Sequence, residues 1–335
     1  MKVNRKSLLE WLKFASLGIA KQGETIEQSN SFVFTEGELI TFNDEVMTRS
    51  KNPLDITGAV LATEFLRLVE KFPDDELDIT IKGEEVIIKG TRRSAGVTRL
   101  ADIHLPYDAV PVPKKTFKLD DRTLPMLLQA ARTCGKDVTQ ELTMLVHVTP
   151  KIVEACDNFR MFRATLPTGF PAEGLMTASS ILLLETLTVK RVGMGDGWVH
   201  FKLGPGQSIS LRCSAGKYHE NIDGVLDIGE ASETTLPDDL EAAITRSLIT
   251  MSDNEDPNIR VTLTKNKLMV ESRKAEGWYK ETKSVKHTGG DLSILIHPKF
   301  LVDMLKRTKK IQINPSRMKM EADGIEFVVA MIVPK

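Results

Sequence analysis

Aromatic side chains are scarce in this chain of 335 residues, at 6% of the total. A protein that binds single-stranded nucleic acid by stacking bases needs several aromatic platforms, so that class is disfavoured. The formal net charge is only −1, and the bulk composition therefore gives no sign of nucleic-acid affinity. A local basic stripe that is balanced by acid elsewhere remains compatible with this total.

Cysteines and long apolar runs are also few. Cys134, Cys156 and Cys213 lie far apart and form no CxxC pair, so the sequence supports neither a zinc site nor a disulfide framework. A reducing cytoplasm is the simplest expectation. The first residues interrupt their apolar positions with Glu10 and Lys13, which indicates an amphipathic helix and not a signal peptide. No run approaches the roughly 18 apolar residues of a membrane span.

Catalytic signatures are weak as well. The segment GMGDG at 193–197 has glycines at alternate positions but precedes a strand, so a turn is expected and not a phosphate cradle. The acids at 74–76 and 238–239 fall at helix or strand ends, where capping or solvation explains them. No histidine has HxxxH or HxxE spacing, and all are expected to be structural or exposed: His104, His147, His200, His219, His287 and His297. We therefore expect no catalytic residue, no metal and no cofactor.

The informative feature is an internal repeat. Amphipathic helices are predicted at 5–18, 62–72, 121–134, 178–190, 238–252 and 298–310. Alternate members recur at intervals of about 116 to 120 residues, which indicates three similar units. Capping chemistry supports the starts: Asp121 or Thr123 with Pro125, Pro237 followed by acids, and His297 before Pro298.

The segments between these helices alternate polar and apolar residues, as strands do. Hairpins are predicted for 199–203 with 208–213, 77–81 with 85–90, 259–263 with 267–272, and the three segments 311–315, 317–321 and 325–333. Antiparallel sheets with helices on one face follow, an α+β class. The stretches 110–115 and 228–235 are predicted to be exposed linkers.

The sequence resembles a known family, the bacterial DNA polymerase III beta sliding clamps. The resemblance rests on an ordered set of segments: LLEWLKFASLGIAK, LATEFLRLVEKFPDDELDITIKGEEVIIKG, LADIHLP, ACDNFRMFRATLP, CSAGKYHENIDGVL, IHPKFLVDMLKRTKKIQI and EFVVAMIVPK. Asn158 and Phe159 replace a common Gly-His, and His219 replaces a common Pro. These departures are typical of a divergent member, of the kind that phages or plasmids carry.

The resemblance implies three clamp domains, at 1–112, 113–227 and 228–335, each with two helices on antiparallel sheets. Two chains would join head to tail into a ring of six domains around duplex DNA. The expected partners are double-stranded DNA without sequence preference, a replicative polymerase, a clamp-loader ATPase and repair factors with short clamp-binding motifs. The expected place is the cytoplasm, at a bacterial nucleoid or in an infected host cell.

In such a ring, the helices present lysine and arginine to DNA phosphates. The first helix fits, because Leu8, Leu12 and Ala15 share an apolar stripe away from Lys6 and Lys13. The resemblance nominates these residues for DNA contact: Lys6, Lys13, Lys21, Arg67, Lys71, Arg132, Lys136, Lys190, Arg191, Arg246, Lys299, Lys306 and Lys310. An ordinary solvated helix face is the alternative for each of them.

The resemblance also nominates a pocket for partner peptides and a contact between chains. The pocket would be lined by Phe159, Arg160, Met161, Val333 and Pro334, although buried core is the alternative and Arg160 could form a structural salt bridge. The dimer contact would involve Leu105, Ile249 and Met251, which would otherwise be exposed apolar residues.

Two other functions remain open. The first is a metal-dependent nuclease or hydrolase with scattered acidic ligands, which incubation with magnesium or manganese would reveal. The second is a non-ring regulatory protein that keeps the fold, which the molar mass in solution would reveal.

Overall fold

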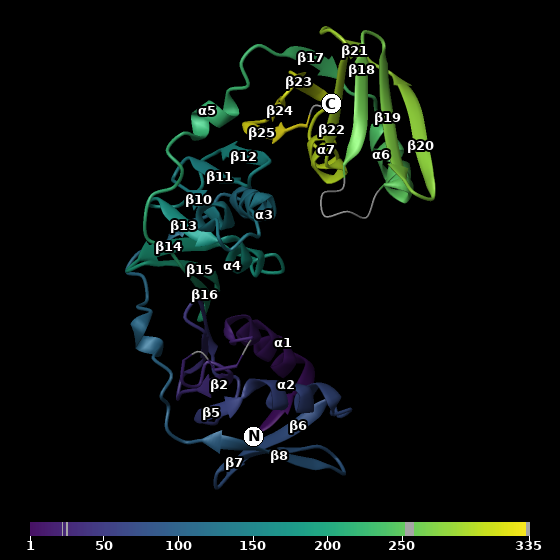
Figure 1. The fold of residues 1–335 in the computed structure, drawn as a ribbon. Coiled ribbons are helices and arrows are strands. Elements are labelled where there is room, and N and C mark those ends of the chain that lie inside the picture. The colour runs from purple at the N-terminus through teal and green to yellow at the C-terminus, as the bar shows by residue number, and fades with distance from the viewer. Residues whose placement is uncertain (22, 25, 252–257, 333–335) are drawn as a thin grey trace. The chain divides into compact units, whose positions relative to one another are not determined.

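A computed structural model describes residues 1–21, 23–24, 26–251 and 258–332 (Figure 1). The chain divides into two compact units. Unit 1 comprises 1–128, 148–150 and 168–216, and unit 2 comprises 129–147, 151–167 and 217–335. Because the division does not follow the predicted boundaries near 112 and 227, the three-domain organisation stays a prediction. Among the described residues, no helix is both long and apolar enough to cross a membrane.

Seven α-helices and four 3₁₀ helices are described. They are α1 (Arg5–Ala15), η1 (Ser16–Gly18), α2 (Ala62–Lys71), η2 (Tyr107–Ala109), α3 (Thr123–Thr133), η3 (Glu141–Met144), α4 (Ala178–Leu182), α5 (Ile222–Leu226), α6 (Leu240–Ser247), η4 (Leu248–Thr250) and α7 (Pro298–Leu305). All six predicted helices exist. The His297 ring accepts a hydrogen bond from the Lys299 amide at 3.2 Å, which confirms it as the cap of α7.

Two predicted helices are wrong in length: 298–310, because α7 ends at Leu305, and 178–190, because α4 ends at Leu182. Beyond α4 the amides of Leu184 and Glu185 bond to carbonyls three residues back, at 2.9 and 3.2 Å. This 3₁₀-type pattern is tighter than an α-helix and rarely persists. The β-branched residues at 186, 188 and 189 then favour extended chain.

The strands confirm the α+β class and the predicted hairpins. They are β1 (Lys2–Asn4), β2 (Ser31–Phe34), β3 (Glu38–Phe42), β4 (Val46–Lys51), β5 (Gly58–Leu61), β6 (Glu76–Lys82), β7 (Glu85–Lys89), β8 (Ser94–Leu100), β9 (Phe117–Lys118), β10 (Leu145–Val148), β11 (Ile152–Cys156), β12 (Arg160–Thr165), β13 (Gly174–Thr177), β14 (Arg191–Gly195), β15 (Trp198–Gly204), β16 (Gln207–Arg212), β17 (Ser232–Thr235), β18 (Ile259–Thr264), β19 (Lys267–Lys274), β20 (Gly277–Ser284), β21 (Lys286–His287), β22 (Leu292–Ile296), β23 (Lys310–Ile313), β24 (Arg317–Ala322) and β25 (Ile325–Ala330).

Unit 1 holds a 12-stranded sheet in the order β1-β6-β7-β8-β5-β2-β3-β4-β16-β15-β14-β9. In unit 2, one sheet includes the order β10-β11-β12-β25-β24-β23-β17-β21, and a separate 4-stranded sheet has the order β20-β19-β18-β22. The segment 228–235 is therefore not wholly an exposed linker, since its second half is β17. Thr234 is buried there and its hydroxyl lies 2.7 Å from His287 Nδ1.

The sheet of unit 1 is covered on both faces near β2 and β3. On one face, Leu8 and Leu12 of α1 and Phe65 of α2 pack against Phe32 and Phe34. The opposite, outer face is covered by a segment that follows β8, in a cluster made of Val33, Ile40, Phe42, Met47, Ala59, Leu105, Val110 and Trp198. The segment 102–110 is thus a structural cover and not only a connection.

A buried histidine on β15 gives this unit a pH dependence. His200 Nδ1 lies 2.8 Å from the Ser210 hydroxyl. Burial lowers the pKa of His200 from 6.5 to about 4, and the nearby charges of Lys202 and Arg49 contribute to this decrease. Since the folded-state pKa lies below that of the unfolded chain, the unfolded state binds the proton more tightly. The contribution of neutral His200 to the free energy of unfolding should therefore be fully present above pH 6.5 and decrease as the pH drops toward 4.

We expect the His200→Asn variant to lose this dependence. Between pH 7 and pH 4, the free energy of unfolding of the natural protein should fall by up to about 3 kcal/mol more than that of the variant. Urea unfolding curves at several pH values measure this difference. His104→Asn, at an exposed histidine, should keep the natural dependence. Parallel curves for His200→Asn and the natural protein would contradict the prediction.

Candidate functional site

A pocket of about 570 Å³ opens in unit 2 beside the turn between β11 and β12. Its lining includes three of the five residues nominated from the sequence, Phe159, Arg160 and Met161. The other two, Val333 and Pro334, lie outside the described residues. The opposite wall comes from α5 and the residues before it, with Arg317, Val328 and Ala330 from β24 and β25 completing the lining.

The Asp157 carboxylate fixes the turn that carries Phe159. One of its oxygens accepts hydrogen bonds from the amides of Phe159 and Arg160, each at 2.8 Å. This local side-chain bonding replaces the backbone pairing that a tight turn leaves unsatisfied. The Phe159 ring stays 49% exposed at the pocket mouth. A large apolar side chain held in place and open to solvent is suited to pack against a ligand.

Arg160 is committed to the protein itself. Its Nε donates to the second Asp157 oxygen at 2.9 Å, and its Nη2 donates to the Arg132 carbonyl at 2.8 Å. The guanidinium also lies over the Phe300 ring, 4.4 Å from the centroid. The structural salt bridge, left open from the sequence, is therefore present. The contribution of Arg160 to the pocket is to hold its rim.

Met161 belongs to both the core and the pocket floor. Its side chain is 0% exposed, and its backbone pairs with Cys156 on one side and Val328 on the other. The two alternatives left open by the sequence are thus combined in this residue. Replacing it would create a cavity in the core as well as alter the pocket.

The wall opposite Phe159 was not predicted as part of the pocket. It consists of His219, Glu220, Asn221, Ile222 and Val225. The Arg317 Nη1 atom holds this wall by donating to the carbonyls of Gly224, Val225 and Asp227, at 3.4, 3.4 and 3.2 Å. A cation at these terminal carbonyls of α5 is also favoured by the helix dipole. Residues 60 or more positions from Phe159 form this wall, and no local pattern reveals that proximity.

A network of largely buried polar side chains lies next to the pocket and carries no catalytic signature. Glu154 accepts from Arg163 at 2.7 Å and lies 2.6 Å from His147 Nδ1, while the His147 ring stacks on Tyr218. Burial raises the pKa of Cys156, and it raises that of Cys134 to about 12. Both thiols are therefore protonated at neutral pH and poor nucleophiles. No cluster of metal-ligating side chains occurs among the described residues.

The other sites predicted to be inert behave as turns or structural contacts. Asp196 and Gly197 adopt φ values of 52° and 78°, which makes the end of the GMGDG segment a hairpin turn between β14 and β15. Asp74 accepts from the amide and hydroxyl of Thr91, at 2.9 and 2.7 Å, and so caps a turn. His147, His200 and His287 each contact a polar side chain within the fold.

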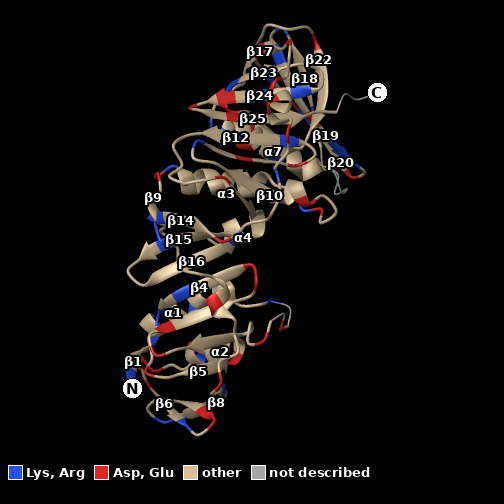
Figure 2. Cartoon of the chain, turned by 90° about the vertical axis from the view of Figure 1, so that its left-hand side faces the viewer, with Lys and Arg blue, Asp and Glu red and all other residues tan. Residues whose placement is uncertain are grey.

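All thirteen residues nominated for DNA contact are exposed, but they differ in position. Helices carry Lys6, Lys13, Arg67, Lys71, Arg132, Arg246 and Lys299, whereas Lys21, Lys136, Lys190, Arg191, Lys306 and Lys310 lie beyond helix ends or on strands. Acidic and basic residues are interspersed throughout both units (Figure 2).

Several of the nominated cations have partners that reduce their availability, and Lys13 Nζ lies 4.0 Å from Glu70 Oε1. Arg246 bonds to the Glu281 carboxylate through two nitrogens, with Nη2 to Oε2 at 2.7 Å and Nε to Oε2 at 3.0 Å. The Arg191 guanidinium donates to the Thr116 hydroxyl at 2.9 Å. Lys306 Nζ lies 3.6 Å from Asp303. Arg246 is the least available, because a phosphate would have to displace a carboxylate held by more than one hydrogen bond.

The three residues nominated for the contact between chains differ in their exposure to solvent. Leu105 is only 3% exposed because it packs in the outer cluster of unit 1, so the expectation that it is exposed is wrong. Ile249 is 72% exposed on η4, and Met251 is half-buried. Ile249 is thus the one of the three that offers a large apolar surface.

No protein-family model matches the sequence, and no curated protein matches it. Solved structures do match along the whole chain. A DNA polymerase sliding clamp from Bacillus subtilis has a TM-score of 0.85 at 15% identity, over 100% of this chain and 99% of that one. The DNA polymerase III subunit beta from Pseudomonas aeruginosa has a TM-score of 0.81 at 18% identity, with the same coverage. A Helicobacter pylori beta clamp, solved with a DNA ligase peptide, has a TM-score of 0.82 at 15% identity, over 100% of both chains. The chain therefore has the fold of the bacterial beta sliding clamps.

Proposed function

We propose that this protein is a DNA sliding clamp, a non-catalytic ring that encircles duplex DNA and tethers a replicative polymerase. The observation that carries the proposal is the sliding-clamp fold along the whole chain, at TM-scores of 0.80 to 0.85. Because identities of 14 to 18% establish the fold alone, function needs its own test. That test is retention on circular DNA and release on linearisation. Cleavage of DNA with magnesium or manganese would instead favour a nuclease.

The three-domain organisation at 1–112, 113–227 and 228–335 is part of this proposal. So are the exposed lysines and arginines as contacts to phosphate, and the pocket beside Phe159 as a site for short peptides of the polymerase, the clamp loader and repair factors. The Helicobacter pylori clamp binds a DNA ligase peptide, which supports a peptide-binding role for the same fold. Location in the cytoplasm of a bacterium or infected host follows from the same proposal.

The strand pairings support a head-to-tail dimer. Within unit 1, β4 pairs antiparallel with β16, and within unit 2, β12 pairs antiparallel with β25. In both cases the last strand of a first hairpin pairs with the last strand of a second one. Two such strands remain without this pairing: β20 ends its sheet, and residues 94–98 of β8 have only β7 as a registered neighbour among the described residues. We propose that β20 pairs with β8 of a second copy, since unpaired edges favour such addition.

Light scattering at micromolar protein should therefore give twice the chain mass of 37.3 kDa. Ile249→Asp places a charge in the proposed contact and should raise the dimer dissociation constant roughly 10- to 100-fold. Val138→Asp is the control, because Val138 is also exposed but lies in the turn region before η3. A monomer at all concentrations, or equal effects of the two substitutions, would contradict the proposed contact.

A further inference from the structure

Three hairpins of the chain share one geometry. In the first, Ile40 pairs with Arg49 and Phe42 with Met47. In the second, Glu154 pairs with Arg163 and Cys156 with Met161. In the third, Glu271 pairs with Lys280 and Arg273 with Trp278. Because the sequence separations within the pairs are the same each time, Arg49, Arg163 and Lys280 occupy equivalent positions, as do Met47, Met161 and Trp278.

In the first hairpin, the face that carries Arg49 and Met47 lies opposite α1 and α2, and it is covered by the chain's own segment 102–110. Leu105 and Val110 pack on Ile40, Phe42 and Met47. The Arg49 Nη2 atom donates to the carbonyl of Tyr107 at 2.8 Å and lies 3.5 Å from that of Val110. A cation at the strand position of Arg49 therefore anchors the covering segment.

In the second hairpin, the covering segment is 217–228, which contains α5. Arg163 Nη1 donates to the Asp223 carboxylate at 2.6 Å, so the equivalent cation again anchors the cover. Tyr218 contacts Cys156, with the hydroxyl 3.5 Å from the sulfur. Tyr218, Ile222 and Leu226 of this segment are buried.

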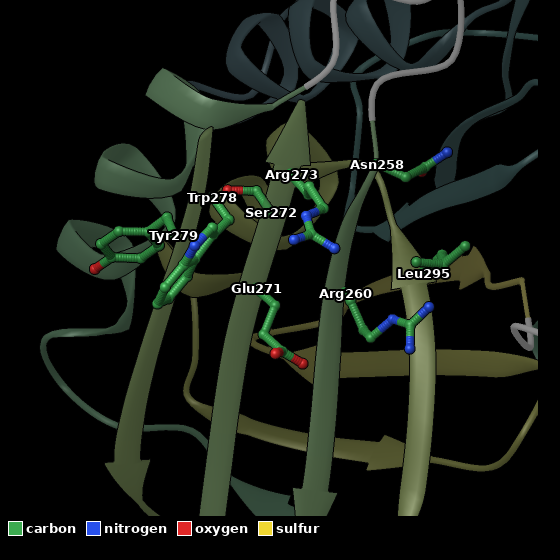
Figure 3. Close-up of a pocket in the computed structure, with 8 residues that line it drawn as sticks. All are labelled: Asn258, Arg260, Glu271, Ser272, Arg273, Trp278, Tyr279 and Leu295. Carbon is green, nitrogen blue, oxygen red and sulfur yellow. The ribbon is translucent and has the colours of Figure 1, made fainter. Parts of the chain in front are cut away.

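In the third hairpin, no described segment of the chain covers the equivalent face. We call this surface the bare face and define it as Arg260, Glu271, Arg273, Trp278, Lys280 and Leu295. All but Lys280 line a hollow of about 500 Å³ on the four-stranded sheet (Figure 3). Trp278 is 65% exposed, although the equivalent Met47 and Met161 are buried under their covers. Tyr279 is turned away and contacts Arg246 instead.

The charges of the bare face determine what it would accept. Among the described residues, Lys280 has one ion-pair partner, Glu271 at 3.3 Å, whereas the equivalent Arg163 pairs with both Glu154 and Asp223. Arg260 and Arg273 make no ion pair with a described residue, so the face carries three cations against one acid. A segment with carboxylates complements this excess, and an apolar side chain would cover the indole of Trp278.

We propose that the bare face is a docking site for an acidic polypeptide segment of another protein. The segment would place a carboxylate at Lys280, as Asp223 does at Arg163, and an apolar side chain on Trp278. This site is separate from the pocket beside Phe159 and does not depend on DNA binding. It is the third use of one structural device: a strand cation that fastens a chain segment across the outer face of a sheet.

A synthetic peptide of residues 217–228 is the probe, because it contains the anchor carboxylate of Asp223 and carries net negative charge. Fluorescence anisotropy of the labelled peptide with the full chain should show saturable binding. Lys280→Glu should weaken it at least 10-fold, and so should Arg273→Glu. The peptide with Asp223→Asn should bind several-fold more weakly. Lys82→Glu, at an exposed cation of the β6–β7 turn, is the matched control and should bind normally.

Three outcomes would overturn the proposal. Binding that is absent up to millimolar peptide, or equal for Lys280→Glu and the natural protein, would show that the bare face does not take such segments. Light scattering of Lys280→Glu separates the remaining possibility. If this substitution converts a dimer to a monomer, the face belongs to the contact between copies and is not a site for another protein. A dimer that persists while peptide binding falls supports the proposal.

Discussion

Protein loaded onto a nicked circular plasmid should stay bound, and a single cut that linearises the plasmid should release nearly all of it. A ring that touches only phosphate binds weakly and without sequence preference, so retention must come from topology and not from affinity. The protein would be loaded with the clamp-loader ATPase of its polymerase and separated from free protein by gel filtration. The bound fraction is then measured before and after cutting.

The control for this experiment distinguishes a ring from an end-binding protein. Blocking both ends of the linear DNA with bulky protein should restore retention, because a ring cannot slide past the obstacles. Equal retention on circular DNA and on linear DNA with free ends would count against encirclement. A separate mass measurement identifies a chain that keeps the fold without forming a ring.

Basic residues should affect the electrostatic part of this binding. Combined alanine substitution of Arg67, Lys71, Lys299 and Lys306 should lower the salt dependence of DNA binding, by about 0.9 in the log-log slope for each phosphate that is no longer neutralised. Folding should be unaffected, since all four side chains are exposed. Alanine at Lys82, Lys89, Arg92 and Lys267 removes as many exposed cations outside the helices and serves as the control.

Local sequence patterns predicted most of the fold because local physics determines those parts. The β24–β25 hairpin follows from alternation around Asp323-Gly324, whose φ values of 53° and 76° suit a tight turn. The start of α7 follows from His297 and Pro298. The end of α4 was missed because residues 183–190 keep apolar spacing while their hydrogen bonds change to the three-residue pattern.

The candidate site was less predictable, because its parts meet only in three dimensions. The Asp157–Arg160 ion pair spans three residues and could have been inferred from the turn. The burial of Leu105 could not, since it depends on a segment crossing the outer face of β3 and β4. Likewise, the wall at 219–225 faces Phe159 only because α5 packs beside β25. Family resemblance nominates residues, but packing decides which of them are accessible.

Phe159→Ala should weaken binding of a peptide from the cognate polymerase by roughly 10- to 100-fold, or on the order of 1–3 kcal/mol. The Phe159 side chain is held at the pocket mouth by the Asp157 turn and remains half exposed. A peptide can therefore bury it without unfolding the protein. A few well-packed apolar side chains carry most of the energy of such interfaces. Isothermal titration calorimetry with the natural protein and the variant measures the change.

The buried residue Met161 provides the contrast that locates the effect. Because its side chain is fully buried, Met161→Ala should lower the free energy of unfolding by about 2–5 kcal/mol, whereas Phe159→Ala should leave it nearly unchanged. Val138→Ala, at another exposed apolar residue of unit 2, should alter neither stability nor affinity. Removing residues 332–335 should also weaken peptide binding while the dimer persists, as light scattering would show. If Phe159→Ala binds the peptide as tightly as the natural protein does, the peptide site lies elsewhere on the chain, and Asn158 and Phe159 mark the divergence that moved it.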